Sequence, residues 1–275
     1  MNIKTVDINL NESLASTAFT QQADKFDELY SCNTIIKYKR NRVREHLSKF
    51  VAPGLSILEL NSGTGEDAIW LAEQNCHVHA TDISVGMIEV LQQKVDDAHL
   101  EKLINSEICS FTALENLKNQ GPYDLIFSNF AGLNCTGELN KVLTSFTGLL
   151  KPKGIVTLVI LPKFCLWEFL LIFKGKLQTA MRRLFSKNGV KARVEQTNFT
   201  CWYYNPSYVM KHLKKDFDLL DIEGLCTIVP PSYIENFPEK FPKLFSSLCK
   251  IENSWKNKWP WKYIGDYYII SLQKK

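Results

Sequence analysis

The sequence predicts an α/β protein with a doubly wound, mostly parallel sheet. An apolar run, Ser56–Leu60, leads into a turn with Gly63 and Gly65 and then into an amphipathic segment, which is the order of a βαβ unit. A second apolar run ends at Asp82. Short apolar runs and helical patterns then alternate as far as residue 161, as strands and helices do in a parallel sheet.

Composition gives weaker limits. The 275 residues are 45% hydrophobic, which suits one large domain or a core domain with a cap. The formal net charge of +4 is mild and does not by itself indicate nucleic acid. The first residues lack a secretory pattern, and no window of 18 apolar residues lacks charge, so we expect a cytoplasmic protein.

The eight cysteines are irregularly spaced and none forms a C-x-x-C pair. Several lie within apolar runs, which favours buried thiols in a reducing compartment. We therefore expect no metal site. Zinc binding and disulfides are the alternatives that the sequence leaves open.

The N-terminal part predicts a helical arm. Residues 1–18 are polar, and we expect them to be loosely ordered. Apolar residues recur at a spacing near 3.6 from Phe19 to Tyr30 and predict a helix. Residues 34–50 predict a second helix with a basic face.

The turn after the first strand is the first candidate binding site. Gly63 and Gly65 permit positive φ and close approach of the backbone to a ligand, and the following helix start offers unpaired N–H groups. Asp82 follows Gly65 by 17 positions (82 − 65), near the place where an acidic residue holds ribose hydroxyls in nucleotide-binding folds.

The remaining core elements follow in order. We expect a helix over 85–98, a strand over 104–109, a strand over 125–128, a helix over 142–150, a turn over 151–154 and a strand over 155–161. Ligands bind beyond the carboxyl ends of such strands. The residues expected to converge there are Gly63, Gly65, Asp82, Ser110 and Asn129.

The run LELNSGTGEDAIWLA, with VHATDIS and YDLIFSNFAGLN after it, resembles the class I S-adenosylmethionine-dependent methyltransferases over roughly residues 20–160. The resemblance implies a Rossmann-like seven-stranded sheet with an antiparallel last strand and S-adenosyl-L-methionine as cofactor. It also implies a transferase acting on a small molecule.

The family's acidic-x-Gly-x-Gly-x-Gly motif corresponds here to residues 59–65, with Asn61 in place of the first glycine. Asn tolerates positive φ better than most residues, so we expect the turn to survive. The family's usual carboxylate after the third strand is absent from residues 109–111. The resemblance implies these cofactor-binding residues: Tyr30, Tyr38, Arg40, Glu59, Asn61, Gly63, Gly65, Asp82, Ile83, Met87, Cys109, Ser110, Phe111, Asn129, Phe130 and Asn134.

Beyond residue 162 the chain departs from a minimal methyltransferase. Apolar positions from Leu166 to Leu184 predict an amphipathic helix interrupted at Gly175. Residues 163–193 carry eight basic residues and one acidic residue, a charge of +7, so the rest of the chain sums to −3 (4 − 7). A solvated cap helix, binding of an acidic or phosphorylated substrate, and peripheral contact with an anionic membrane all fit this charge. No nucleic-acid motif accompanies it.

The C-terminal part predicts the closing strands of the sheet. An aromatic cluster over 199–204 precedes a helix that ends at Leu213 and suits a substrate pocket or the core. Strands are expected over 217–228 and near the C-terminus, with an aromatic lid between them. We therefore divide the chain into a helical arm (1–52), a cofactor-binding core (53–162), a cap insertion (163–215) and closing strands with a lid (216–275).

The expected chemistry is methyl transfer to a small apolar, amphiphilic or lipid-like acceptor, with oxygen favoured as the nucleophile. This displacement requires alignment and exclusion of water more than a fixed catalytic group. His212, Tyr203 and Tyr204 are weak candidates for a base. A nucleotide-dependent oxidoreductase and a non-catalytic cofactor-binding or membrane-associated protein stay open as alternatives.

Overall fold

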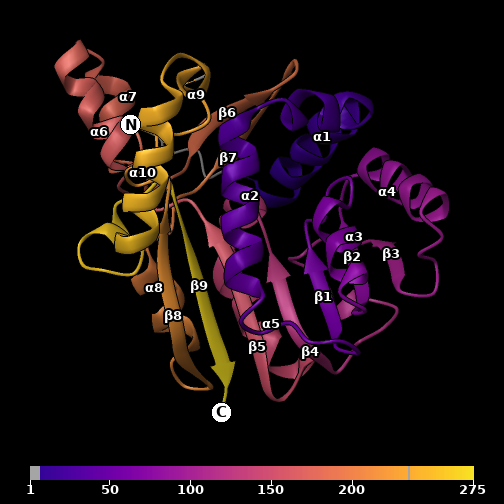
Figure 1. Cartoon of the computed structure of the whole chain (residues 1–275). Helices are drawn as coiled ribbons and strands as arrows, with labels where there is room; N and C mark the ends of the chain where they lie inside the picture. The colour runs from indigo at the N-terminus through magenta and orange to yellow at the C-terminus, as the bar shows by residue number, and fades with distance from the viewer. Residues whose placement is uncertain (1–6, 235) are drawn as a thin grey trace.

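The computed structural model describes residues 7–234 and 236–275, and its centre is a seven-stranded sheet of order β3-β2-β1-β4-β5-β9-β8 (Figure 1). The strands of this sheet are β1 (Ser56–Leu60), β2 (His77–Asp82), β3 (Ile104–Ile108), β4 (Tyr123–Ser128), β5 (Leu150–Ile160), β8 (Phe217–Leu225) and β9 (Tyr267–Lys274). The strands from β3 to β5 pair in parallel, and β9 runs antiparallel between β5 and β8. The predicted fold class is confirmed, including the inserted antiparallel last strand.

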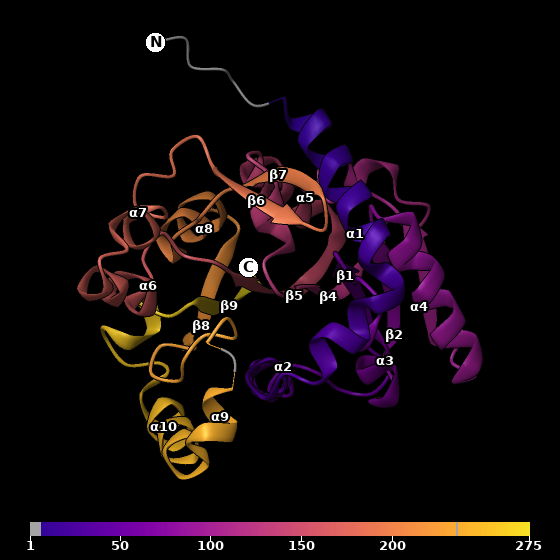
Figure 2. The same ribbon diagram turned by 90° about the horizontal axis from the view of Figure 1, so that it is seen from above.

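Helices cover both faces of the sheet, with α2 and α3 on one side and α5 and α8 on the other (Figure 2). Their bounds are α1 (Ile8–Ser31), α2 (Thr34–Leu47), α3 (Glu66–Glu73), α4 (Val85–Asp97), α5 (Leu139–Leu149), α8 (Pro206–Leu213), α9 (Phe237–Lys240) and α10 (Pro242–Trp255). Neighbouring residues of β1 supply opposite cores: Leu58 packs with Phe146 of α5, and Ile57 packs in the cluster that contains Leu71 of α3. In the described ranges no helix has the length and apolarity that crossing a membrane requires.

The N-terminal arm is longer than predicted. Helix α1 begins at Ile8, so the expectation of loose order is wrong for residues 8–18, while residues 1–6 lie outside the described residues. Asp7 caps the helix by accepting a hydrogen bond from the N–H of Leu10. The buried side of this first part includes Asn11 and Glu12, so apolar periodicity gives no signal there.

The cap also differs in detail. The predicted helix is interrupted at Gly175, as expected, where φ is 71°, and its first half is itself divided: the elements are α6 (Leu166–Leu170), a 3₁₀ turn (Leu171–Lys174) and α7 (Leu177–Met181). A hairpin of β6 (Val190–Val194) and β7 (Thr197–Cys201) follows, which the sequence did not predict. Asn11 of α1 holds this hairpin, because its side chain accepts from the N–H and donates to the carbonyl of Thr200.

The segment expected to be a lid is fixed to the sheet by one buried carboxylate. Glu252 of α10 is 1% exposed and accepts from the Tyr38 hydroxyl of α2 at 2.9 Å. Its oxygens also accept from four consecutive backbone N–H groups after β8, those of residues 226–229, at 2.8–3.0 Å. This single side chain therefore joins α2, α10 and the end of β8.

A second buried carboxylate, Glu223 on β8, lies beside His46 and Asp221 in a spacing that suits a metal ion. Cationic side chains already surround it, since Arg42 and Lys256 contact its Oε2 at 2.9 and 3.2 Å and Lys49 contacts Oε1. Burial alone would raise the pKa of Glu223, but the His46 ring nitrogen 3.0 Å from its Oε1, the hydrogen bond from Lys49 and nearby positive charge hold that pKa below its usual range. The cluster is therefore a structural ion-pair network.

Replacing Glu252 by Gln should lower the free energy of unfolding by roughly 2–4 kcal/mol. The substitution exchanges one acceptor oxygen for an NH₂ group and leaves buried backbone N–H groups without a partner. Urea denaturation followed by circular dichroism would measure the change. Glu101→Gln, at an exposed position, is the matched control, and equal stability of the two variants would contradict the assigned role.

Candidate active site

A cavity lies at the carboxyl ends of the central strands, covered by α1 and α2. The empty space within it is about 940 Å³, part of which is open to solvent. The predicted residues that line it are Arg40, Glu59, Asn61, Gly63, Asp82, Ile83, Met87, Ser110, Phe111, Asn129 and Phe130. Side chains from five distant segments of the chain thus meet at one place.

Asp82 connects the glycine turn to the start of α4. Its Oδ2 accepts from the N–H of Gly63 at 3.0 Å, and its Oδ1 accepts from the N–H of Ser84 at 2.9 Å. Burial raises the pKa of Asp82, and these backbone N–H groups partly offset that rise. Each oxygen keeps a further lone pair, so the fixed carboxylate has the capacity to accept from two neighbouring hydroxyls.

Asn61 joins the ends of β1 and β4. Its φ of 48° confirms that Asn adopts the left-handed conformation expected at this position. Its Nδ2 donates to the carbonyl of Asn129 at 2.8 Å, and its Oδ1 accepts from the Ser128 hydroxyl at 2.5 Å. A Cβ on Gly132 would lie 2.2 Å from the Asn61 Cγ, so this side chain occupies space that only a glycine at 132 leaves open.

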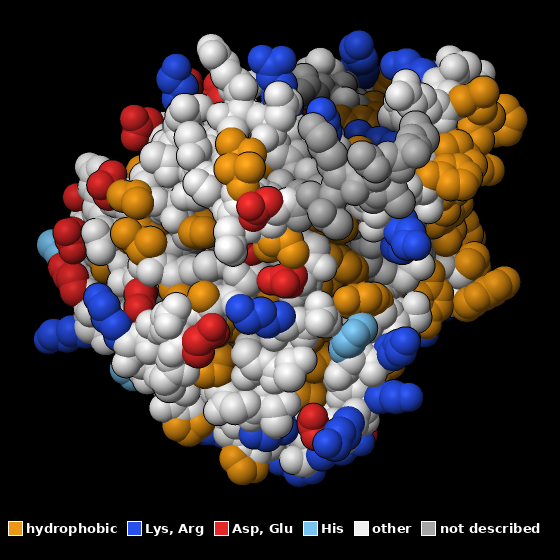
Figure 3. All heavy atoms as spheres, turned by 180° about the vertical axis from the view of Figure 1, so that it is seen from behind, with side chains coloured by type: hydrophobic (Ala, Val, Ile, Leu, Met, Phe, Trp, Pro, Cys, Tyr) orange, Lys and Arg blue, Asp and Glu red, His pale blue; other side chains and the backbone are white. Residues whose placement is uncertain are grey.

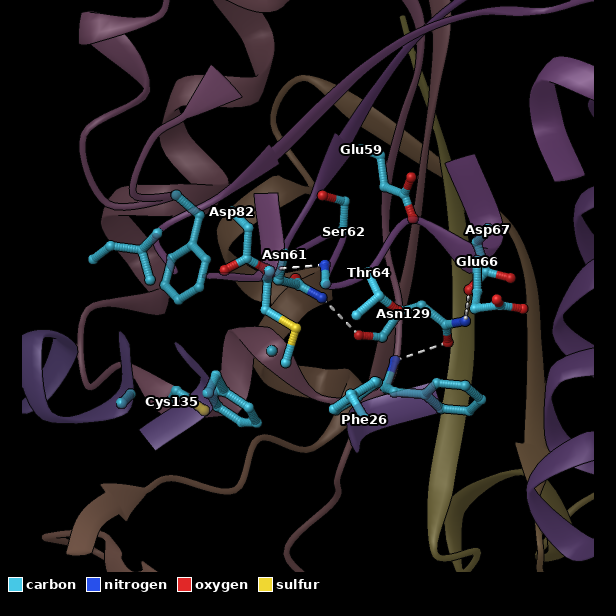
Figure 4. A pocket seen from close by; sticks show the side chains of 18 of the residues that line it. Phe26, Glu59, Asn61, Ser62, Thr64, Glu66, Asp67, Asp82, Asn129 and Cys135 are labelled. Carbon is cyan, nitrogen blue, oxygen red and sulfur yellow. Dashed lines mark hydrogen bonds between the residues drawn. The ribbon is translucent and has the colours of Figure 1, made fainter. Parts of the chain in front are cut away.

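The acidic residues on the other side of Asn61 are Glu59, Glu66 and Asp67 (Figure 4). Asp67 contacts Arg40 and Arg44 at 3.0 and 3.1 Å. Its Oδ2 also accepts from the Asn129 amide at 2.7 Å. Asp67 is thus fully partnered, and it positions both Arg40 and Asn129 at the cavity.

Glu59 is different, because it is 2% exposed and its Oε2 has no hydrogen-bond partner among the described residues. Burial raises its pKa well above the usual range. The charge of Asp67 raises the pKa further, while Arg40 and Arg44 partly offset the shift. A buried acid with a free oxygen fits a ligand that brings a positively charged donor.

Glu12 is a cavity residue that the sequence analysis missed. Its Oε2 accepts from the hydroxyls of Ser110 and Thr112 at 2.7 and 2.9 Å, and its buried Oε1 has no partner among the described residues. Glu12 thus brings a carboxylate from α1 to the end of β3, because residues 109–111, which follow that strand, include no carboxylate. The spacing of Glu12, Ala15 and Phe19 on one helix face is the signal that was available.

Five predicted residues do not line this cavity. The Tyr38 hydroxyl bonds Glu252 on the far side of α2, and Tyr30 packs on Phe26 at 4.5 Å beside a neighbouring cleft. Gly65 has a φ of 81°, and a Cβ there would lie 2.7 Å from Leu91, so this glycine serves helix packing.

The other two belong to the loops below the cavity. The Cys109 thiol is buried and faces the carbonyl of Ala113 at 3.6 Å. The Asn134 amide bonds the backbone of Leu161 and Trp202, which fixes the start of the cap.

The three candidate bases also lie elsewhere. His212 is exposed and its Nδ1 contacts the carbonyl of Tyr208 at 2.9 Å. The Tyr204 hydroxyl donates to the carbonyl of Thr136 at 2.6 Å, and burial raises its pKa above the usual range. The Tyr203 ring packs on the Arg183 guanidinium, 5.1 Å from the ring centroid. Among the described residues that line the cavity none is a histidine.

Comparison with known proteins matches the chain to methyltransferases. Residues 57–154 match a family model described as a methyltransferase domain. The chain is 31% identical over 103 residues to the putative methyltransferase YqeM of Bacillus subtilis, covering 36% of this chain and 40% of that protein. It is 26% identical over 160 residues to the ubiquinone/menaquinone biosynthesis C-methyltransferase UbiE of Rickettsia felis, covering 55% of this chain and 62% of that one. The matches therefore span less than two thirds of these two relatives.

Solved structures share the fold. Magnesium protoporphyrin IX methyltransferase from Synechocystis, with bound S-adenosylhomocysteine, superposes with a TM-score of 0.61 at 14% identity, covering 96% of this chain and all of that chain (100%). The 1,6-didemethyltoxoflavin-N1-methyltransferase of Burkholderia thailandensis gives a TM-score of 0.57 at 12% identity, covering 100% and 93%. The chain thus has a stretch, residues 57–154, that matches a methyltransferase domain, and its seven-stranded sheet is a fold that it shares with these two methyltransferase structures.

Proposed function

We propose that the chain is an S-adenosylmethionine-dependent methyltransferase whose cofactor occupies the cavity beneath α1 and α2. The observation that carries the proposal is a pair of buried carboxyl oxygens, Glu59 Oε2 and Glu12 Oε1, which have no hydrogen-bond partner within residues 7–234 and 236–275 and belong to residues that line one cavity together with the glycine turn. The cofactor offers a cationic α-ammonium and an adenine amino group, two donors that such oxygens accept.

The other roles follow from the same geometry. Asp82 would accept from the ribose hydroxyls, since backbone N–H groups already fix both of its oxygens. Ile83, Met87 and Phe111 would enclose the adenine with apolar surface. In this proposal residues 1–52 form the covering arm, 53–162 the cofactor core, 163–215 the cap and 216–275 the closing strands with α9 and α10.

When bound, the cofactor supplies an electrophilic methyl group on a sulfonium. The protein's own contribution would be alignment and exclusion of water. Helix α1 is fixed over the cavity by hydrogen bonds from Ser16 to the carbonyl of Ile83 and between Thr20 and Ser84. Arg40, held by Asp67, covers the Phe130 ring at 5.1 Å. Phe130 has a φ of 44°, a strained conformation that turns this apolar ring toward the cavity.

We propose a small apolar or amphiphilic acceptor that lies against Phe130. Relatives named ubiquinone/menaquinone C-methyltransferase and demethylmenaquinone methyltransferase support an aromatic, quinol-like molecule. These names, and the lack of a histidine among the described lining residues, favour a ring carbon over the oxygen expected from the sequence. Mass spectrometry of the product from an isoprenoid naphthoquinol, compared with that from a catechol, distinguishes carbon from oxygen transfer.

Titration calorimetry with S-adenosylhomocysteine should show one binding site per chain. Asp82→Ala should weaken binding by about a hundredfold or more, because two charge-assisted hydrogen bonds are lost. Asp97→Ala, on the exposed end of α4, is the control and should bind as the unmodified chain does. Absence of heat from the folded unmodified chain would refute the proposed function.

Binding should release protons at any pH below the raised pKa of Glu59, because the acid is then mostly protonated in the free protein. A ligand ammonium favours the carboxylate and lowers that pKa, so affinity should rise with pH between the lowered and raised values. Calorimetry in buffers of different ionisation enthalpy measures the released protons. Glu59→Gln should abolish the release, and a buffer-independent enthalpy for the unmodified chain would contradict this role.

Glu12→Gln should reduce the preference for an adenine base. S-inosylhomocysteine carries a carbonyl in place of the amino group, so it should bind the unmodified chain about tenfold or more weakly than S-adenosylhomocysteine. In the Gln variant the two ligands should bind more equally, because the side-chain amide is able to donate to that carbonyl. An unchanged ratio in a variant that still binds S-adenosylhomocysteine would remove Glu12 from the adenine site while leaving the cofactor site intact.

A further inference from the structure

The cap presents apolar side chains to solvent along one edge of the molecule. Phe173 is 84% exposed, Phe185 77% and Leu177 59%. Figure 3 shows hydrophobic side chains gathered at the edge that carries α6 and α7 in Figure 1. We call this surface the apolar edge and define it as Phe169, Leu170, Phe173, Leu177, Leu184 and Phe185.

The inner side of the same segment is charged. Glu168 is 1% exposed and Arg183 is 4% exposed. The Arg183 guanidinium donates to Glu168 Oε1 at 2.9 Å and to Asp266 Oδ1 at 2.7 Å, which ties the cap to the start of β9. The usual distribution of a soluble helix is therefore reversed, with ions inside and aromatic rings outside. Hydrogen bonds fix Glu168 and Arg183 on the inner side of the cap. The fold therefore places the rings of Phe173 and Phe185 on the outer side.

Positive charge surrounds the apolar edge. Glu168 is the only acidic residue between 163 and 193, and Arg182 and Arg183 both pair with it. Lys174, Lys176 and Lys187 are exposed, and within residues 7–234 and 236–275 none of them has a salt-bridge partner. A surface that combines exposed aromatic rings with unpaired lysines has the chemistry of an interface with anionic lipid.

We propose that the apolar edge docks on the surface of an anionic lipid bilayer. Charge favours this occupant over a second copy of the chain, because a symmetric contact would place the same lysines against one another. The edge is also connected to the cavity. Asp266, which Arg183 holds, precedes Tyr267, and the Tyr267 ring lies 6.2 Å from the Phe130 ring that lines the cavity. The inner side of the cap is therefore linked through Asp266 and Tyr267 to the Phe130 wall of the cavity.

The proposal is tested by co-sedimentation of the whole chain with vesicles of phosphatidylcholine alone or mixed with phosphatidylglycerol. The unmodified chain should bind the anionic vesicles, and added salt should weaken that binding. Phe173→Ser with Phe185→Ser should reduce it by about tenfold or more, since two exposed rings no longer enter the lipid interface. Reversing the charge of Lys174, Lys176 and Lys187 to Glu should reduce it as well.

Ile108→Ser is the matched control, because Ile108 is 53% exposed on β3 at the opposite edge of the sheet. It should bind vesicles as the unmodified chain does, and near-ultraviolet circular dichroism should show that every variant is folded. No binding to anionic vesicles, or binding that the serine variants retain, would overturn the proposal. A dimer in light scattering that the serine variants abolish, without vesicle binding, would identify a second copy as the occupant and would also overturn it. The assay contains no cofactor, so its outcome is separate from that of methyl transfer.

Discussion

The carboxylate of Asp67 is the contact on which the arrangement of the candidate site depends. It receives Arg40 and Arg44 from α2 and the Asn129 amide from the end of β4, while its own helix begins at the glycine turn. Two acids, Glu59 and Asp67, therefore lie near the same pair of arginines, and Asp67 takes the direct contacts. Burial raises the pKa of Glu59 well above its usual range and the nearby Asp67 raises it further, and Glu59 Oε2 has no hydrogen-bond partner in the described part of the chain. One carboxylate organises the site, and the other is left for a ligand.

The departure at Asn61 shows how a glycine position is exchanged without losing the turn. Asn61 meets the backbone requirement through its positive φ, and its side chain replaces missing contacts by linking β1 to β4. The Asn61 side chain needs space that a glycine at 61 would not need. Gly132 leaves that space open, because any Cβ at 132 would overlap the Asn61 amide. The two residues are 71 positions apart (132 − 61), so a single-sequence motif shows the loss at 61 without the compensation at 132.

Local patterns predicted most of the sheet. Strand β1 and the start of α4 agree with their predicted bounds, because buried apolar runs and turn residues mark them locally. The first part of α1 was missed for a physical reason: Asn11 and Glu12 are buried through hydrogen bonds to Cys135, Ser110 and Thr200, which are distant in sequence. The same reason explains why Tyr38 was wrongly expected at the cavity. Its hydroxyl partner, Glu252, is distant in sequence and lies in a segment predicted only as a lid.

The cap shows a further limit of predicting structure from apolar periodicity. A regular apolar spacing indicates that a helix has an apolar and a polar face, but it does not indicate which of the two is buried. The apolar spacing from Leu166 onward fits a helix packed on a core, yet Glu168, Arg183 and Asp266 occupy the inner side. Once an ion pair is buried, removing it from water is tolerated only if every charge keeps its partners. With these charges on the inner side, the rings of Phe173 and Phe185 lie in solvent, 84% and 77% exposed. Exposed aromatic surface of this kind is costly in water and favours a partner that is itself apolar. The positive charge of the segment thus has two parts, one that fixes the cap from inside and one that surrounds the exposed rings.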